Sequence, residues 1–134
     1  MARPKNRSFE TCVLPDQFDV LAPDGSEIRI LLANGNASMA HGTLQPGGIS
    51  RAVTHRTVEE IWYVLTGNAD LWRKNDDQEE IVSLSADLSV TIPLGTHFQF
   101  RTVGDDPFKF IMCTTPPWPG ENEAIRVEDH WPVS

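Results

Sequence analysis

Short runs of alternating apolar and polar residues fill most of the chain, and an alternation with a period of two is typical of half-buried strands. Ten prolines and nine glycines separate the runs, and no interval shows a sustained helical period with caps at both ends. Short strands at regular spacing favour an all-β antiparallel sandwich or barrel. The pattern predicts eight or nine strands, within residues 17–22, 27–33, 38–44, 61–65, 71–74, 81–84, 88–92, 98–102 and 108–114.

The length of 134 residues predicts one domain with a single core. We expect an N-terminal arm over residues 1–15, a barrel over residues 16–115 and a tail over residues 116–134. The tail begins with a rigid proline-rich segment that cannot continue a central strand, so it is predicted to fold back over the barrel as a short helix or lid.

Eleven basic and nineteen acidic residues give a net charge of −8, which repels phosphate backbones and anionic lipids. Neither a nucleic acid nor a membrane is therefore expected as a partner. Cys12 and Cys113 show no ligand spacing, which is typical of two free thiols in a reducing compartment. With no segment typical of a signal peptide or a membrane span, the chain is predicted to be cytoplasmic.

One glycine-bounded segment has a spacing that suits a binding site. Gly47, His55, Glu60 and Gly67 are spaced as in the first motif of the cupin superfamily, which this segment resembles. That motif carries a first His two positions before His55, where this chain has Val53.

A second segment resembles the second cupin motif. Pro93 and Gly95 fit it, whereas Asp87, Phe98 and Thr102 stand at its Gly, His and Asn positions. The resemblance implies a double-stranded β-helix, also called a jelly-roll barrel, and cupins often form homodimers, so a homodimer is expected too.

Side chains alternate along a strand, so their faces can be read from the sequence. Arg51 and His55 share one face, Glu60 and Trp62 share the next, and the resemblance implies that both faces line the barrel interior. Such an interior is predicted to be a pocket for a small polar molecule. The predicted ligand-binding side chains are Arg51, Val53, Trp62, Phe98 and Phe100.

The same alternation predicts that His97 points away from the pocket, because burying Phe98 and Phe100 removes more apolar area from water. A slip of one residue at the Gly95 turn would reverse these faces.

A typical cupin holds a metal ion with three His and one Glu, and here only His55 and Glu60 stand in place. His97 or His41 would have to supply a third ligand, since two are too few for a tight divalent site. His and carboxylate ligands would suit Zn, Fe, Ni or Mn. The cofactor is therefore either absent or one such divalent ion.

Three functions remain open. In the first, the barrel binds a small polar metabolite, and His55 and Glu60 perform acid–base chemistry such as isomerisation, epimerisation, elimination or decarboxylation. The second is a metal-dependent dioxygenase or lyase, and the third is a non-catalytic ligand-binding or dimerising module. Whether the chain is an enzyme stays open, because one fold supports many functions.

Overall fold

The structure is a computed structural model that describes residues 8–133, and the first half of the predicted arm lies outside this range. The described residues form eleven strands and no helix, and they therefore contain no helix that could span a membrane. The strands are β1 (Val20–Leu21), β2 (Glu27–Ala33), β3 (Ser38–Leu44), β4 (Val53–His55), β5 (Glu59–Thr66), β6 (Asn68–Lys74), β7 (Glu79–Leu84), β8 (Ser89–Ile92), β9 (His97–Val103), β10 (Phe108–Thr115) and β11 (Ala124–Arg126).

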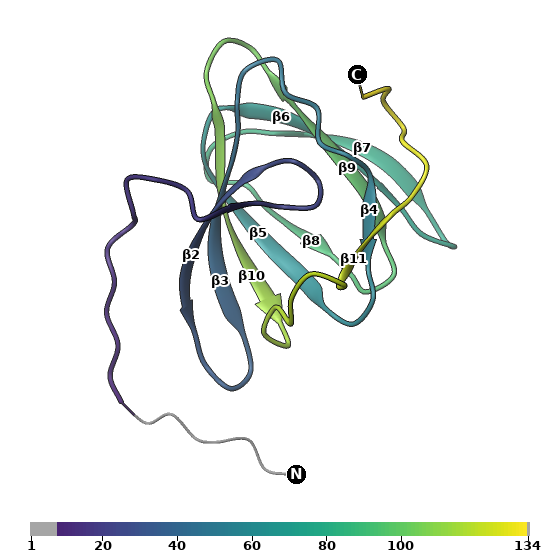
Figure 1. Cartoon of the computed structure of the whole chain (residues 1–134). Coiled ribbons are helices and arrows are strands. Elements are labelled where there is room, and N and C mark those ends of the chain that lie inside the picture. Colours follow the sequence, from purple (N-terminus) through teal and green to yellow (C-terminus); the bar gives the residue numbers. More distant parts are fainter. Residues whose placement is uncertain (1–7, 134) are drawn as a thin grey trace.

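The strands form two antiparallel sheets that face each other (Figure 1). The six-stranded sheet has the order β1-β2-β3-β10-β5-β8, and the five-stranded sheet has the order β11-β4-β9-β6-β7. Neighbours such as β3 and β10 are distant in sequence, as a jelly roll requires. The prediction of an all-β jelly-roll barrel is therefore confirmed.

Aromatic side chains fill the space between the two sheets. Five of them are at most 2% exposed, and neighbouring ring centroids lie 4.3–6.1 Å apart. Each aromatic ring removes a large apolar area from water, so these rings supply much of the core. They are Trp62, Phe98, Phe100, Phe108 and Phe110.

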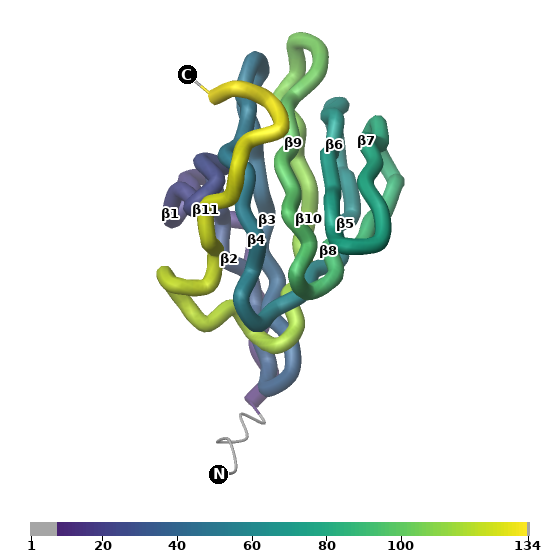
Figure 2. Tube along the Cα trace, turned by 90° about the vertical axis from the view of Figure 1, so that its right-hand side faces the viewer, coloured from purple at the N-terminus to yellow at the C-terminus, as the bar shows by residue number. Residues whose placement is uncertain are grey.

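The tail after β10 returns along the five-stranded sheet (Figure 2). β11 pairs with β4, with Ala124 opposite His55, and Trp131 is only 9% exposed. The predicted short helix is wrong for the described residues, because the tail takes its hydrogen bonds from the barrel and not from its own backbone.

One side chain on the outer face of β9 fastens this tail. The Oε1 atom of Gln99 accepts hydrogen bonds from the backbone amides of His130 and Trp131, both at 2.8 Å. Its Nε2 atom donates to the carbonyl oxygens of Ser50 and Trp131, at 2.8 and 2.9 Å. These four bonds explain why a polar residue can be fully buried here.

Gly67 at the turn between β5 and β6 leads to a first prediction. Its φ is +81°, and a Cβ atom there would lie 2.3 Å from the carbonyl oxygen of Pro107. Gly67→Ala should therefore combine backbone strain with a clash and lower the free energy of unfolding by roughly 2–4 kcal/mol. Gly47→Ala is the control, since Gly47 has a φ of +78° with no atom within 4 Å of the added Cβ. Equal losses for both variants in urea unfolding would contradict the role of the clash.

Candidate functional site

His55 lies at the end of β4 and is 8% exposed. Its ring packs edge-on against Phe98 and Trp118, with centroid distances of 5.3 and 5.1 Å. Burial lowers the pKa of His55 to about 4, although the nearby Glu123 carboxylate acts in the opposite direction. The imidazole is therefore neutral at neutral pH, and its buried Nδ1 atom has no hydrogen-bond partner.

Glu60 lies on β5 and is 5% exposed. The indole Nε1 of Trp62 donates to its Oε1 at 2.9 Å, and the Thr114 hydroxyl donates to its Oε2 at 3.1 Å. Burial raises the pKa of Glu60 to about 7, against the effect of these hydrogen bonds and with a further rise from Asp24 and Glu123. Glu60 thus changes its protonation state near neutral pH.

His55 and Glu60 form neither an ion pair nor a hydrogen bond with each other among the described residues. Phe98 nevertheless packs against both the His55 ring and the Trp62 ring, and the Trp62 indole donates to Glu60, so the two residues lie toward the same end of the barrel. A direct bond between His55 and Glu60 is therefore not what holds the two side chains in place. Two buried titratable groups without opposite charges bonded to them are a frequent mark of a functional site.

Residues 116–123 cover this end of the barrel. The backbone amide of Trp118 donates to the Ser38 hydroxyl at 3.0 Å, and the Trp118 ring, 37% exposed, closes over His55. At the other end of this cover, Glu123 accepts hydrogen bonds from the backbone amide and the hydroxyl of Thr57, at 2.7 and 2.6 Å, and from the amide of Val58 at 3.0 Å. The cover is thus fixed at two points.

No pattern in the sequence points to Glu123, because its partners lie 65 and 66 residues earlier in the chain and no motif links them. The Trp118 ring packs on the barrel at His55. A proline-rich segment with one aromatic residue, directly after the last barrel strand, was the available signal for a cover.

Replacing Glu123 gives a second prediction. Burial alone would raise the pKa of Glu123, but the hydrogen bonds from Thr57 and Val58 outweigh it and hold the pKa below the usual value. Glu123→Gln leaves one acceptor oxygen for three donors, so it should lower the free energy of unfolding by about 1–3 kcal/mol at neutral pH.

The pH dependence follows from the same direction of shift. A depressed pKa contributes stability that is present above the unfolded value of 4.5 and is lost as the pH falls through the folded value. The difference in the free energy of unfolding between Glu123→Gln and the parent should therefore narrow as the pH falls below 4.5. The exposed Glu121→Gln is the control, and an equal effect there would contradict this role of Glu123.

The predicted ligand-binding side chains are placed in two ways. Four of them belong to the packed core, at 0–2% exposure, so they fill the barrel and leave the interior close-packed around them. These are Val53, Trp62, Phe98 and Phe100. Arg51 is exposed instead, and its backbone amide donates to the carbonyl oxygen of Asp24 at 2.7 Å.

The two further candidate ligands of a metal lie on outer faces of the barrel. His97 is exposed on β9, where its neighbour Phe98 points into the core, as the alternation predicts. His41 is opposite Ile111, whereas its neighbour Gly42 faces the buried Phe110, so His41 points out of the barrel interior although it is only 3% exposed. Neither histidine is brought to His55 and Glu60.

The remaining donors do not fit a divalent metal ion. The positions of the two missing cupin ligands hold Val53 and Phe98, and both oxygens of Glu60 already accept hydrogen bonds. Over residues 8–133, no group of three or more His, Cys, Asp or Glu side chains is arranged to hold a metal. His55 and Glu60 alone are too few ligands to hold a divalent ion tightly.

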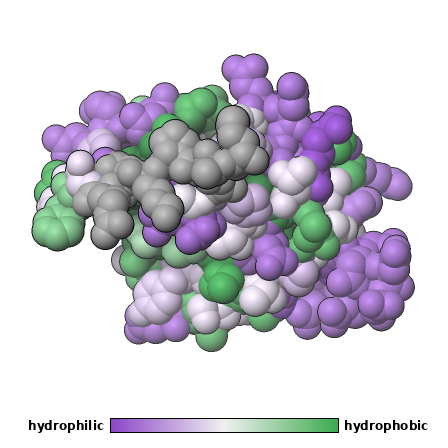
Figure 3. Space-filling model, turned by 90° about the horizontal axis from the view of Figure 1, so that it is seen from below, coloured by the Kyte–Doolittle hydropathy of each residue, from purple (hydrophilic) through white to green (hydrophobic). Residues whose placement is uncertain are grey.

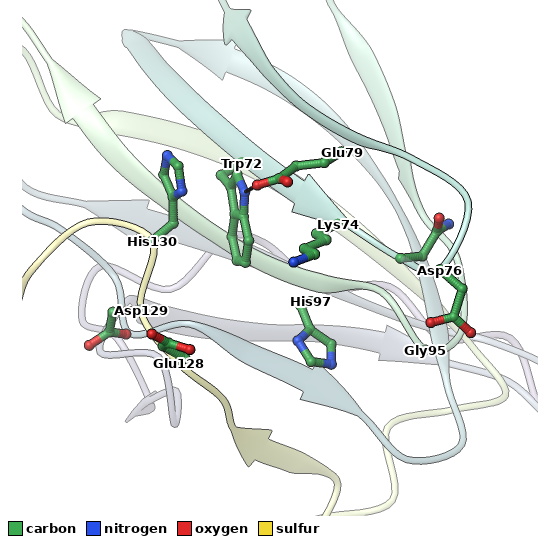
Figure 4. Close-up of a pocket in the computed structure, with 10 residues that line it drawn as sticks. Trp72, Lys74, Asp76, Glu79, Gly95, His97, Glu128, Asp129 and His130 are labelled. Atoms are coloured by element: carbon green, nitrogen blue, oxygen red, sulfur yellow. Dashed lines mark hydrogen bonds between the residues drawn. The ribbon is translucent and has the colours of Figure 1, made fainter.

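His97 instead lines a hollow of about 480 Å³ between the β6–β7 hairpin and the tail (Figure 4). There the rings of Trp72 and His130 stack, with centroids 5.0 Å apart and planes at 9°, and the Trp72 indole donates to Glu79 at 2.8 Å. The hollow therefore lies where the tail is attached to the barrel through the stacking of His130 on Trp72.

Comparison with known proteins gives one family match and several relatives. A family model described as a cupin domain matches residues 40–114. The xanthan biosynthesis protein XanB of Xanthomonas campestris is 30% identical over 87 residues, which are 65% of this chain and 18% of XanB. The chain therefore spans only about a fifth of that relative. The uncharacterised protein MJ1618 of Methanocaldococcus jannaschii is 27% identical over 84% of this chain and 94% of its own length.

Among solved structures, a variant of the oxalate decarboxylase of Bacillus subtilis superimposes with a TM-score of 0.69 over 81% of this chain and 30% of that one. The two sequences are 16% identical. At this identity the likeness concerns the fold alone.

Proposed function

The chain belongs to the cupin domain family, and from this premise we propose that it is an acid–base enzyme for a small polar molecule, with its site at His55 and Glu60. One observation carries the proposal: two buried titratable side chains lie at the covered end of the barrel without a charged partner bonded to them. Structural ion pairs explain many shifted pKa values, but neither residue is in one here.

Glu60 is the proposed acid and base. With a pKa of about 7, it is half ionised at neutral pH, so it can take a proton from a substrate and return it. The bonds from Trp62 and Thr114 fix the direction of its carboxylate. An isomerisation, epimerisation or elimination needs such a proton carrier, and a decarboxylation needs one to protonate its product.

His55 is the proposed orienting group. It is neutral at neutral pH, and its unpartnered Nδ1 atom is available for one hydrogen bond with a ligand. A buried polar atom without a partner is costly, so a ligand that supplies one gains affinity. A ligand can reach this atom only when the cover at residues 116–123 moves, since Trp118 packs on the His55 ring.

For the substrate we propose a sugar derivative. XanB is named for the biosynthesis of a polysaccharide, and it is more similar to this chain in sequence than the oxalate decarboxylase is. A sugar with a carbonyl group carries an acidic C–H beside it, which is the kind of proton that Glu60 would transfer.

The test follows proton exchange without requiring the exact substrate. The protein is incubated in D₂O with a panel of aldoses, ketoses, sugar acids and oxalate, and proton NMR records the loss of C–H signals and the release of formate. We expect exchange with at least one sugar. Glu60→Gln should slow it about 100-fold or more, whereas the exposed Glu59→Gln should leave it unchanged.

Exchange that persists in Glu60→Gln would overturn the catalytic role, and so would the absence of exchange with every compound. Metal analysis of untagged protein separates this proposal from a metal-dependent cupin enzyme. A stoichiometric metal that is lost in Glu60→Gln would favour the latter.

The packed interior favours a second candidate, a non-catalytic module. Trp62, Phe98 and Phe100 occupy the space that a ligand would take in an open barrel. In that case none of the panel would be turned over.

A further inference from the structure

A second, smaller hollow lies between the β6–β7 hairpin and the turn from β8 to β9. It measures about 250 Å³, and Arg73 and Thr96 are among the residues that line it. The hairpin reaches the right-hand edge of the molecule in Figure 1, and in the view from below hydrophilic residues gather on that side (Figure 3). We call this space the Arg73 hollow.

The Arg73 hollow adjoins the end of the barrel that holds His55 and Glu60. Arg73 is opposite Phe98 in the pair of β6 and β9, and Phe98 packs on the His55 ring. Residues opposite one another in an antiparallel pair point to the same face, so Arg73 starts from the inner side of its sheet. Its guanidinium donates to a carbonyl oxygen of β8 at 2.8 Å, and on that strand Ile92 is opposite Glu60. Arg73 thus extends from a neighbour of His55 toward a neighbour of Glu60.

The Arg73 hollow is positively charged at neutral pH. Of the charged side chains that line it in the described part of the chain, Arg73 and Lys74 are basic and Glu80 is acidic. Asp76 and Glu79 line the other, larger hollow. The chain as a whole has a net charge of −8, so a positive hollow is an exception on its surface.

Arg73 keeps donors for a ligand. Its side chain is 18% exposed and forms an ion pair with Glu80, in addition to its bond to β8. A guanidinium has five N–H donors, so these two bonds leave three. The same two bonds hold the guanidinium in one place.

Thr96 is a second sign that the hollow suits a ligand. Its side chain is 3% exposed, and its buried hydroxyl oxygen has no hydrogen-bond partner among residues 8–133. A buried polar group without a partner costs free energy, and a ligand that bonds to it removes this cost. Thr96 can therefore add a hydrogen bond to a group that Arg73 attracts.

We propose that the Arg73 hollow binds an anionic group of the substrate, a carboxylate or a phosphate. A guanidinium recognises both anions through two parallel N–H donors, and Lys74 adds a second positive charge. The proposal rests on the proposed function, since it makes the substrate an acidic sugar derivative whose reacting carbon lies at Glu60. Arg73 is in this view a specificity residue, which selects the substrate but transfers no proton.

Isothermal titration calorimetry of the full chain tests the preference for anions. The titrants are neutral hexoses, the matching hexose 6-phosphates and the matching hexonic acids. We expect at least one acidic sugar to bind about 10-fold or more tightly than its neutral parent, and the difference should shrink with added salt. The better of the two acidic series identifies the anion as phosphate or carboxylate. Equal binding of neutral and acidic sugars, or no binding of any, would overturn the proposal.

Arg73→Gln should abolish the preference for acidic sugars. Arg73→Lys should keep part of it, because Lys retains the charge but not the planar pair of donors. Glu80→Gln should tighten the binding of acidic sugars, since it removes a negative charge and frees a donor of Arg73. Lys109→Gln is the control, because Lys109 is exposed on β10 and lies outside the hollow. A preference that persists in Arg73→Gln, or that Lys109→Gln also abolishes, would overturn the role of Arg73.

Thr96→Val separates binding from folding. The lost hydroxyl has no partner, so the free energy of unfolding should not decrease, whereas the affinity for acidic sugars should fall about 3- to 10-fold. Urea unfolding and calorimetry measure the two effects. A destabilised variant with unchanged affinity would overturn the assignment of Thr96 to the hollow.

Calorimetry and proton exchange together separate this subsite from the acid–base function. A preference for acidic sugars without any exchange in D₂O would refute the acid–base function and support the subsite. Exchange that is equally fast with neutral and acidic sugars would refute the subsite and support the acid–base function.

Discussion

Glu60→Gln is expected to stabilise the fold by about 3 kcal/mol above pH 8 and to leave it unchanged below pH 4.5. The pKa of Glu60 rises from 4.5 to about 7 on folding, so the folded state favours the protonated carboxyl. Between these values the folded state binds more protons, and stability falls as the pH rises. Gln keeps an acceptor for the Trp62 indole and cannot ionise.

Urea unfolding at several pH values measures this effect. The exposed Glu59→Gln, one residue earlier on β5, should show no comparable gain above pH 8. Combined with the exchange experiment, the outcome is distinctive: the variant that loses proton transfer becomes the more stable protein, as expected for a strained functional residue. A destabilised Glu60→Gln at pH 8 would refute the raised pKa.

His55 makes the free energy of unfolding depend on pH in the opposite direction, and His55→Phe should remove this dependence. The pKa of His55 falls from 6.5 to about 4 on folding, so the parent has its full stability above pH 6.5 and loses about 3 kcal/mol as the pH falls to 4. Phe keeps an aromatic ring against Phe98 and Trp118 but cannot take up a proton. The variant should be free of this loss, which urea unfolding at about pH 4 and pH 7.5 would show.

The pKa shifts of Glu60 and His55 together predict the slope of the free energy of unfolding against pH. Between pH 4.5 and 6.5 the folded state keeps its proton on Glu60, whereas the unfolded chain keeps one on His55. The numbers of bound protons are equal, so these two residues should contribute no slope in the parent. In Glu60→Gln the free energy of unfolding should vary with pH through His55 alone, and in His55→Phe through Glu60 alone. The double variant should again show no slope from these two positions.

Local patterns in the sequence were sufficient for most of the barrel. β2 and β3 begin and end at the predicted residues. The alternation on β9 correctly predicts that Phe98 and Phe100 point into the core. Alternation succeeds there because a slip of one residue would expose both rings. For His41 no such argument existed, since residues 38–44 do not alternate between large apolar and polar side chains. The sequence therefore does not show which face of this strand points into the barrel.

The interior and the tail depended on contacts that no local pattern encodes. The aromatic residues of β5, β9 and β10 were visible, but only their meeting between the sheets shows that they fill the barrel. Gln99 looked like an ordinary polar residue on an outward face. Its partners lie 31, 32 and 49 residues away, so neither β11 nor the attachment of Trp131 could be foreseen.

The order of strands has a consequence for synthesis of the chain. β10 lies between β3 and β5 in the six-stranded sheet, and Gln99 bonds to His130 and Trp131, which are made after it. While a ribosome is still making residues 108–131, β3 and β5 have no strand between them and expose the edges that β10 will cover. The part of the chain made before β10 should therefore need protection from aggregation until β10 and the tail emerge, because the six-stranded sheet cannot close without β10.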